Sequence, residues 1–354
     1  MNAANRTLLL SLLIFGISPF AIADRMDSYK MIGGHGQANI KHPAWFKESF
    51  LDLQEDLREA KKAGKRGVII FFSQKNCSHC QAFLDVTFND PATQKRVRKD
   101  YDVIGLDIFN DVEVTGIGGS AKSIRNFAEE EKARLTPTLV FYGTDNTRLL
   151  KLIGFYPPEK FNRALDYIDG GQYKRQSFSA YLREIGPTPG SGGQPVKFDH
   201  TVFAKPPYML DRTRTSAKRP LLVVFERPNC DACTRFHRNV LNDAEVRDLM
   251  ASYDRVQLDM TDNRTSLTTP GGQQRTPQRW AQELDLTYDV AVVFFDEQGK
   301  EVHRLDSESG TARMTGSMQY VLEKAYTRHE QYLRWRKENA QKAKSPGKEA
   351  APSQ

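Results

Sequence analysis

Residues 67–80 read GVIIFFSQKNCSHC, and this stretch decides the fold. Its first six residues form an unbroken apolar run, which is typical of a strand buried on both faces of a sheet. The run leads into Cys77-Ser78-His79-Cys80, and a helical pattern follows to about Phe88. The stretch therefore predicts a buried strand that delivers a pair of cysteines to the start of a helix.

A second copy of this pattern lies about 153 residues further along the chain. Residues 221–233 read LLVVFERPNCDAC, so Cys230 and Cys233 occupy the places of Cys77 and Cys80. The expected helix caps Asn89-Asp90 and Asn242-Asp243 repeat at the same offset. We infer an internal duplication of one β-α-β-α-β-β-α unit, and all four cysteines of the chain lie within it.

Apolar periodicity and cap residues predict the other elements of both copies. In the first copy we expect helices over 43–63, from 91 onward, over 120–133 and over 158–168, strands over 103–108, 138–142 and 149–154, and a polar helical bridge over 171–185. In the second copy we expect strands over 221–225, 256–260, 291–295 and 301–305, and a long C-terminal helix over 318–340. The fold class is therefore α/β.

Changes in composition along the chain predict where the domains begin and end. Residues 186–195 are rich in Gly, Pro and Ser, which is typical of a linker. The expected organisation is a signal peptide at 1–23, a loose lead-in at 24–42, a first domain at 43–185, a linker at 186–197, a second domain at 198–340 and a basic disordered tail at 341–354.

The overall composition excludes several classes of protein. With 39% hydrophobic and 27% charged residues, the 354-residue chain can build real cores and is not disordered throughout. A mean hydropathy of −0.58 excludes a multi-pass membrane protein. The net charge is +7, and residues 331–354 hold six basic and two acidic side chains. Because no aromatic residues interleave a basic patch, we expect a solvated tail and no nucleic-acid partner.

The N-terminus has the pattern of a secretory signal. Arg6 precedes an apolar run from Leu8 to about Ile17, and Ala21-Ile22-Ala23 offers a small-x-small cleavage site. The run is shorter than the ~20 residues that a spanning helix needs, although an uncleaved anchor stays an alternative. We expect a mature chain that begins at Asp24 and works in the periplasm or is otherwise secreted, where disulfides persist.

A CxxC pair at the start of a helix is suited to redox chemistry. Unpaired backbone N–H groups and the helix dipole favour a thiolate at the first cysteine, and the second lies one turn on. Rival interpretations are a shared zinc site, although the two pairs lie in different domains, and a structural disulfide, although so small a loop stabilises little. Gln81 and Thr234 stand where haem attachment needs His. We therefore expect no cofactor and no metal.

The strand–CxxC–helix unit, followed by Thr136-Pro137-Thr138 at the head of a strand, resembles the thioredoxin superfamily. The resemblance covers about 43–170 and, more weakly, 198–326, and is nearest to extracytoplasmic thioredoxin-like proteins of the SoxW type. It implies two tandem thioredoxin-like folds, each with a central mixed sheet flanked by helices. It also implies a cis Pro137 beside the disulfide, with Thr136 shaping an edge where a substrate chain pairs. Cys77 would attack, and Cys80 would resolve.

The sequence departs from the family pattern at several positions. Many thioredoxins carry a buried acid six residues before the first cysteine, but this chain has Phe71 and Val224 there. The second domain has Asp289-Val290-Ala291 in place of Thr-Pro-Thr, so its role as relay, docking module or redox relic stays open. We expect a partly positive His79 to stabilise the Cys77 thiolate and Asp231 to disfavour that of Cys230. The first pair should then be the more oxidising.

These observations predict a thiol–disulfide oxidoreductase that acts on extracytoplasmic protein thiols, as a disulfide reductase or isomerase. Its partners would be protein thiol or disulfide substrates, and a reductase would need a membrane thiol electron carrier. Cys77, Cys80, Thr136, Pro137 and His79 are the expected site residues. Cys230 and Cys233 are the expected residues of a second redox pair. The rival functions are a redox-inactive docking module and metal handling through the cysteine pairs.

Overall fold

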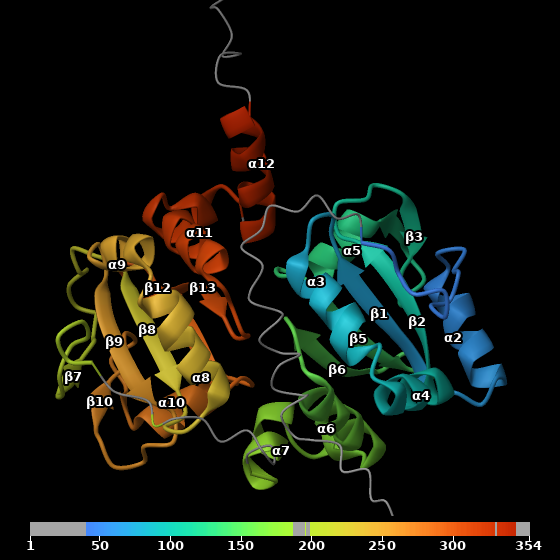
Figure 1. Cartoon of the computed structure of the whole chain (residues 1–354), viewed down its shortest axis with the longest axis horizontal. Helices are drawn as coiled ribbons and strands as arrows, with labels where there is room; N and C mark the ends of the chain where they lie inside the picture. The colour runs from blue at the N-terminus through green and yellow to red at the C-terminus, as the bar shows by residue number, and fades with distance from the viewer. Residues whose placement is uncertain (1–39, 187–194, 196–198, 330, 345–354) are drawn as a thin grey trace, which may run out of the picture. The chain divides into compact units, whose positions relative to one another are not determined.

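The computed structural model describes residues 40–186, 195, 199–329 and 331–344 (Figure 1). The expected signal peptide, most of the lead-in, nearly all of the linker and residues 345–354 lie outside these ranges. Two units of similar architecture follow one another along the chain. We call residues 43–185 the first domain and residues 198–340 the second. In the described part of the chain, no helix has the length and apolar character needed to cross a membrane.

A four-stranded mixed sheet forms the centre of the first domain. Its strands are β1 (Gly67–Ser73), β2 (Tyr101–Asp107), β5 (Thr138–Gly143) and β6 (Arg148–Ile153). The strand order is β2-β1-β5-β6, with β1 parallel to β2 and antiparallel to β5. Every residue of β1 and β5 is buried, which explains why these strands are continuous apolar runs.

Helices flank this sheet, and several of them begin at cap residues that the sequence supplies. They are α2 (Leu53–Lys62), α3 (Ser78–Ala82) with its π-helical continuation η1 (Phe83–Thr87), α4 (Pro91–Asp100), α5 (Ile124–Glu130), α6 (Pro158–Asp169), η2 (Gln172–Lys174) and α7 (Phe178–Glu184). Asp90 accepts a hydrogen bond from the Thr93 N–H, so the expected start of α4 is confirmed. A short hairpin, β3 (Glu113–Thr115) and β4 (Ala121–Ser123), precedes α5.

The second domain repeats the central sheet. Strands β8 (Leu221–Glu226), β9 (Asp254–Asp259), β12 (Val290–Phe295) and β13 (Glu301–Leu305) take the order β9-β8-β12-β13. Its helices are α8 (Asp231–Phe236) with η3 (His237–Leu241), α9 (Ala244–Met250), α10 (Pro277–Glu283) and α11 (Thr311–Leu322). A small separate sheet joins β7 (Tyr208–Met209), β10 (Leu267–Thr268) and β11 (Gln274–Arg275). The duplication inferred from the spacing is thus a duplication of topology.

The helix expected over 43–63 is wrong in its first half. The helix α2 begins only at Leu53, where Asp52 caps the N–H groups of Gln54 and Glu55. Before it, Leu51 has a φ of 65°, which a continuing right-handed helix does not allow. The apolar residues Trp45 and Phe46 instead pack against Phe88, which directly follows η1. The spacing of these apolar residues therefore reflects tertiary packing and not a helix.

Two other expected helices are also shorter than the pattern indicated. Over 120–133 the chain first forms strand β4, and α5 starts at Ile124 behind the Ser123 cap. The long helix expected over 318–340 is two helices, α11 and α12 (Tyr332–Lys344), separated by the 3-10 turn η4 (Ala325–Thr327). Lys324 has a φ of 51° and ends the first of them. Helix α12 also runs into the first four residues of the segment expected to be a disordered tail.

The two faces of the sheet of the second domain pack against different helices. The residue of β8 that lies under the cysteine helix α8 is determined by this arrangement. Leu221, Val223 and Phe225 belong to one core cluster with Trp280 of α10. Because side chains alternate along a strand, Glu226 at the end of β8 projects to the opposite face. On that face its carboxylate meets His237 of η3, the continuation of the cysteine helix α8.

Candidate active site

The first cysteine pair lies where β1 passes into α3. Asn76 has a φ of 58° and turns the chain so that Cys77 becomes the N-cap of α3. Cys77 and Cys80 are joined by a disulfide, and the N–H of Cys80 donates to Cys77 Sγ over 3.1 Å. Cys77 is 5% exposed and Cys80 is completely buried. Cys77 is therefore the more exposed of the two cysteines.

The loop before β5 lies against this disulfide. The Thr136–Pro137 peptide is cis, and Thr136 Oγ1 lies 3.3 Å from Cys77 Sγ. The Pro137 carbonyl accepts from the N–H of Gly154, and Thr138 donates through its hydroxyl to the Leu135 carbonyl. The structure thus brings together two motifs, Cys77–Cys80 and Thr136–Pro137, that are separated by at least 56 residues in the sequence.

The expectation of a partly positive His79 is wrong. Burial disfavours the imidazolium, and Arg313 adds electrostatic repulsion, so the pKa of His79 lies well below its usual value. The imidazole also bonds to the backbone of Glu308. At neutral pH His79 is an uncharged group beside the disulfide. The positive charge in this neighbourhood belongs to Arg313.

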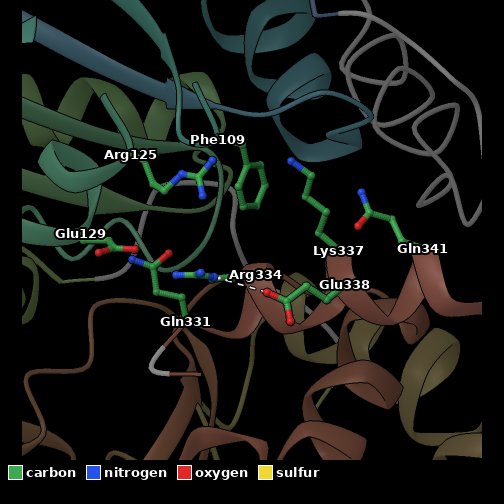
Figure 2. A pocket seen from close by; sticks show the side chains of 8 residues that line it. All are labelled: Phe109, Arg125, Glu129, Gln331, Arg334, Lys337, Glu338 and Gln341. Atoms are coloured by element: carbon green, nitrogen blue, oxygen red, sulfur yellow. Dashed lines mark hydrogen bonds and ion pairs between the residues drawn. The ribbon is translucent and has the colours of Figure 1, made fainter. Parts of the chain in front are cut away.

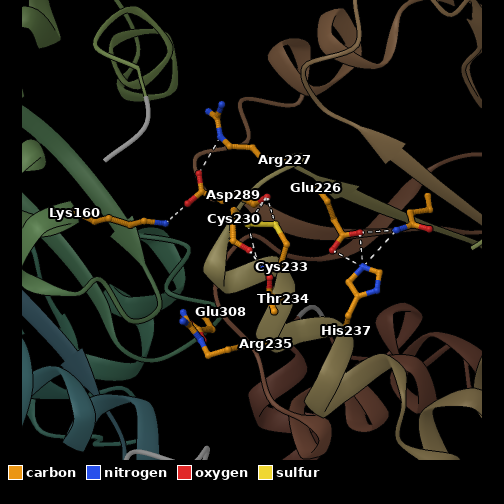
Figure 3. Close-up of a disulfide and its surroundings, with 11 residues drawn as sticks. Lys160, Glu226, Arg227, Cys230, Cys233, Thr234, Arg235, His237, Asp289 and Glu308 are labelled. Carbon is orange, nitrogen blue, oxygen red and sulfur yellow. Dashed lines mark hydrogen bonds and ion pairs between the residues drawn. A yellow bond between two sulfur atoms is a disulfide. The ribbon is translucent and has the colours of Figure 1, made fainter. Parts of the chain in front are cut away.

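The second cysteine pair has the same local geometry at the start of α8 (Figure 3). Cys230 and Cys233 form a disulfide, and the Cys233 N–H donates to Cys230 Sγ over 3.0 Å. Asp289 stands where the first domain has Thr136, and its carbonyl oxygen lies 3.3 Å from Cys233 Sγ. The family's cis-proline is absent here, because Val290 follows.

The Asp289 carboxylate is held by two cations. Lys160 of the first domain pairs with one of its oxygens, and Arg227 Nε lies 2.9 Å from the other. Burial works against the charged form, but the two cations outweigh it, so the pKa of Asp289 is lowered. The position that should open a substrate edge in the second domain is instead part of an ion-pair network (Figure 3).

A buried acid does exist beneath the second pair, at a position that sequence reasoning missed. Glu226 is 0% exposed, and its carboxylate accepts from His237 Nε2 over 2.9 Å and from Gln257 Nε2 over 2.8 Å. Val224, which occupies the position of the family's buried acid, and Glu226 lie on the same face of β8. The acid of this chain therefore lies two residues further along the strand. The available signal was a lone Glu that ends the apolar run of β8. In the first domain Ser73 occupies the matching place.

Several hydrogen bonds link residues of the two domains around these sites. Arg313 Nη2 donates to the Thr136 carbonyl over 3.0 Å. Glu308 bonds through its backbone to His79, while its carboxylate takes two hydrogen bonds from Arg235 of α8, at 2.6 and 2.9 Å. A single short segment of the second domain therefore contacts the first cysteine motif and the helix of the second.

A pocket of about 210 Å³ lies elsewhere and contains neither cysteine pair (Figure 2). It is lined by Phe109 and Arg125 of the first domain and by residues of α12, among them Lys337, whose ammonium lies 4.2 Å from the centre of the Phe109 ring. Arg125 and Arg334 already pair with Asp111 and Glu338. No cysteine, serine, threonine or histidine of the described chain lines this pocket. Among the described residues, no three His, Cys, Asp or Glu side chains gather as metal ligands.

Comparison with known proteins agrees with this geometry. The sequence model of the thioredoxin-like domain family matches the chain twice, over residues 53–169 and 208–322. A search of curated proteins finds no match. Similar solved structures include a thioredoxin-fold protein from Helicobacter pylori, with 16% identity over 36% of this chain and 81% of that one and a TM-score of 0.31. They also include a disulphide isomerase from Xylella fastidiosa, with 13% identity over 42% and 97% of the two chains and a TM-score of 0.24.

The two family matches cover more than half of the sequence, and each contains a β-strand, a CxxC disulfide and a helix in the expected order. They do not single out the SoxW type, which stays a prediction. The chain belongs to the thioredoxin-like domain family and carries the domain twice.

Proposed function

We propose that this protein is an extracytoplasmic thiol–disulfide oxidoreductase that acts on protein thiols as a disulfide reductase or isomerase. The observation that carries the proposal is the Cys77–Cys80 disulfide at the start of α3, beside the cis Thr136–Pro137 peptide. The greater exposure of Cys77 supports its assignment as the attacking thiol and that of Cys80 as the resolving thiol. The location rests on the expected signal peptide alone.

The reaction begins with both thiols of the first pair reduced. The Cys77 thiolate attacks one sulfur of a substrate disulfide, forms a mixed disulfide and releases the other substrate sulfur as a thiolate. Cys80 then loses its proton and attacks Cys77 Sγ, which restores the Cys77–Cys80 disulfide and frees the second substrate thiol. Two electrons pass from the protein to the substrate. A reductase would recover them from a membrane thiol carrier, whereas an isomerase would resolve the mixed disulfide with a second substrate thiol.

The second domain fits a docking role better than a substrate-reducing role. Its Asp289 position is tied to Lys160 of the first domain, and its Arg313 and Glu308 contact the first cysteine motif. These contacts support a role for the second domain as a docking module beside the Cys77–Cys80 site. An electron relay through Cys230 and Cys233 is the rival role, and the two make different predictions for a trapping experiment.

The experiment uses the full mature chain with Cys80→Ser, with Cys233→Ser as the matched variant. Loss of the resolving thiol leaves the mixed disulfide in place, so Cys80→Ser is expected to accumulate covalent complexes with protein substrates on non-reducing gels. If the second domain only docks, Cys233→Ser accumulates none. A Cys80→Ser chain that traps no partner, although Cys77 is free to be alkylated, contradicts the oxidoreductase proposal and favours the docking module.

A glutathione titration with alkylation of each pair separates the directions of exchange. A Cys77–Cys80 potential near about −270 mV resembles that of thioredoxin and indicates a reductase, whereas a value of about −180 mV resembles that of an isomerase. A potential near about −120 mV, as in a strong oxidant, contradicts the proposed direction.

A further inference from the structure

A guanidinium group of the second domain lies at the redox site of the first. Arg313, in the first turn of α11, is 6% exposed, and its Nη2 donates to the Thr136 carbonyl over 3.0 Å. The hydroxyl of the same threonine lies 3.3 Å from Cys77 Sγ. One residue, Thr136, thus contacts both the arginine and the sulfur that is expected to attack.

This guanidinium has an unsatisfied donor. In the described part of the chain, Arg313 Nη1 is one of the few buried side-chain polar atoms without a hydrogen-bond partner. Burying a charged donor without a partner is costly, so such an atom calls for a ligand that the present state of the site does not supply. A disulfide sulfur is neutral. Reduction of the Cys77–Cys80 bond would create an anion at Cys77.

The charged groups around Cys77 also favour an anion at this position. On its own helix His79 is uncharged, because burial and Arg313 lower its pKa. Burial lowers the pKa of Arg313 to about 10, so it stays positive at neutral pH. Arg336 of α12 also acts on His79 as a positive charge. The acidic group of the facing segment, Glu308, has its carboxylate neutralised by Arg235.

We propose that Arg313 is a positioning residue that provides the positive charge for the Cys77 thiolate. Reduction of the pair takes up two electrons from a dithiol and one proton at Cys80, and leaves Cys77 as a thiolate that Arg313 stabilises. Stabilising the reduced form makes the disulfide a stronger oxidant. The inference rests on the proposed redox cycling of Cys77, and it assigns to the second domain control over the first site.

The test compares the full mature chain with its Arg313→Met and Arg313→Lys variants. Methionine keeps much of the buried volume without the charge, and lysine keeps the charge. The rate of Cys77 alkylation by iodoacetamide is measured against pH, with mass spectrometry to identify the peptide. The Cys77–Cys80 and Cys230–Cys233 equilibria with glutathione are measured in the same samples. A thermal melt checks folding, and Arg313→Gln replaces Arg313→Met if the latter does not fold.

A nearby opposite charge commonly lowers the pKa of an acidic group by about one unit or more, so loss of the Arg313 charge should change the Cys77 equilibria by about tenfold. We expect Arg313→Met to slow Cys77 alkylation about tenfold near pH 6 and to shift the Cys77–Cys80 equilibrium about tenfold toward the disulfide. That shift corresponds to about 30 mV for a two-electron couple. Arg313→Lys should retain most of the wild-type behaviour, and the Cys230–Cys233 equilibrium should not change.

Two results have distinct meanings. If Arg313→Met alkylates Cys77 with the wild-type pH profile and equilibrates at the wild-type ratio, the role of Arg313 is refuted while the oxidoreductase proposal stands. If the first pair of the wild-type chain does not equilibrate with glutathione at all, the proposed function fails. The alkylation profile still decides whether Arg313 lowers the pKa of Cys77. A change of similar size at both cysteine pairs would show a general structural effect and would also refute the proposal.

Discussion

The buried carboxylate of Glu226 should be a major source of stability in the second domain. Glu226 is 0% exposed and accepts hydrogen bonds from His237 and Gln257. The perturbation is Glu226→Ala. It removes the acceptor for two donors at once, and one of these donors, Gln257, is itself only 2% exposed and cannot turn to water.

The expected magnitude follows from these contacts. Removing the Glu226 acceptor from the buried Gln257 amide costs about 1–3 kcal/mol, and the partly exposed His237 contributes less because its ring can reach solvent. Loss of one buried methylene adds about 0.8 kcal/mol. We therefore expect Glu226→Ala to lower the free energy of unfolding by roughly 2–4 kcal/mol. Glu226→Gln keeps the volume and one acceptor, so about 1–2 kcal/mol is expected.

The assay is chemical denaturation of the full chain. Unfolding is followed by the fluorescence of Trp280, which lies in the core of the second domain, in a background that lacks the other tryptophans. The exposed Glu323→Gln is the matched control and should change the free energy by less than about 0.5 kcal/mol. The reasoning is refuted if Glu226→Ala unfolds within about 1 kcal/mol of wild type. It is also refuted if Glu226→Gln is as destabilising as Glu226→Ala, because the loss would then not follow the hydrogen bonds.

Two further predictions use the pKa shifts of buried groups. Burial lowers the pKa of His303 from 6.5 to about 3, and its ring bonds to Ser317, so the folded state should lose stability as the pH falls from about 6.5 toward 3 while the unfolded chain takes up a proton. His303→Gln should show a smaller loss over this window in urea unfolding at stepped pH, and parallel curves for the two chains would contradict the assignment. Because Lys160 lowers the pKa of Asp289, Lys160→Met should destabilise the protein at pH 7. That effect should fade as the pH falls below 3.8 and Asp289 is protonated in both chains. The exposed Lys61→Met is the control for the Lys160 variant, and an effect that is independent of pH would show that the ion pair is not its cause.

The local features of this protein could be predicted from short stretches of its sequence. Strands β1 and β8 are apolar runs whose every residue is buried, and the caps Asp90 and Asp243 start α4 and α9 where the pattern placed them. The family resemblance added the cis Thr136–Pro137 peptide, which the structure contains. These features depend on interactions between residues close in the chain, or on a motif that the family keeps together.

The helices that were predicted wrongly show where local patterns become ambiguous. Trp45 and Phe46 have a spacing that suits a helix face, but their rings are buried by packing on Phe88 from another element. The break at Lys324 carries no glycine or proline to announce it. For Trp45 and Phe46, contacts with a distant segment outweighed the local helical preference.

Apolar periodicity, helix caps and CxxC spacing act over a few residues, so the duplicated α/β unit and its two cysteine pairs could be predicted from the sequence, and the family resemblance added the thioredoxin-like fold. The charges around the two pairs depend on tertiary contacts. Arg313 reaches Thr136 across 177 residues of chain, and burial rather than residue type makes His79 neutral. Glu226 becomes a buried acid because β8 ends beneath the helix that carries His237. Electrostatics and desolvation depend on which groups meet in space, and no local pattern records that.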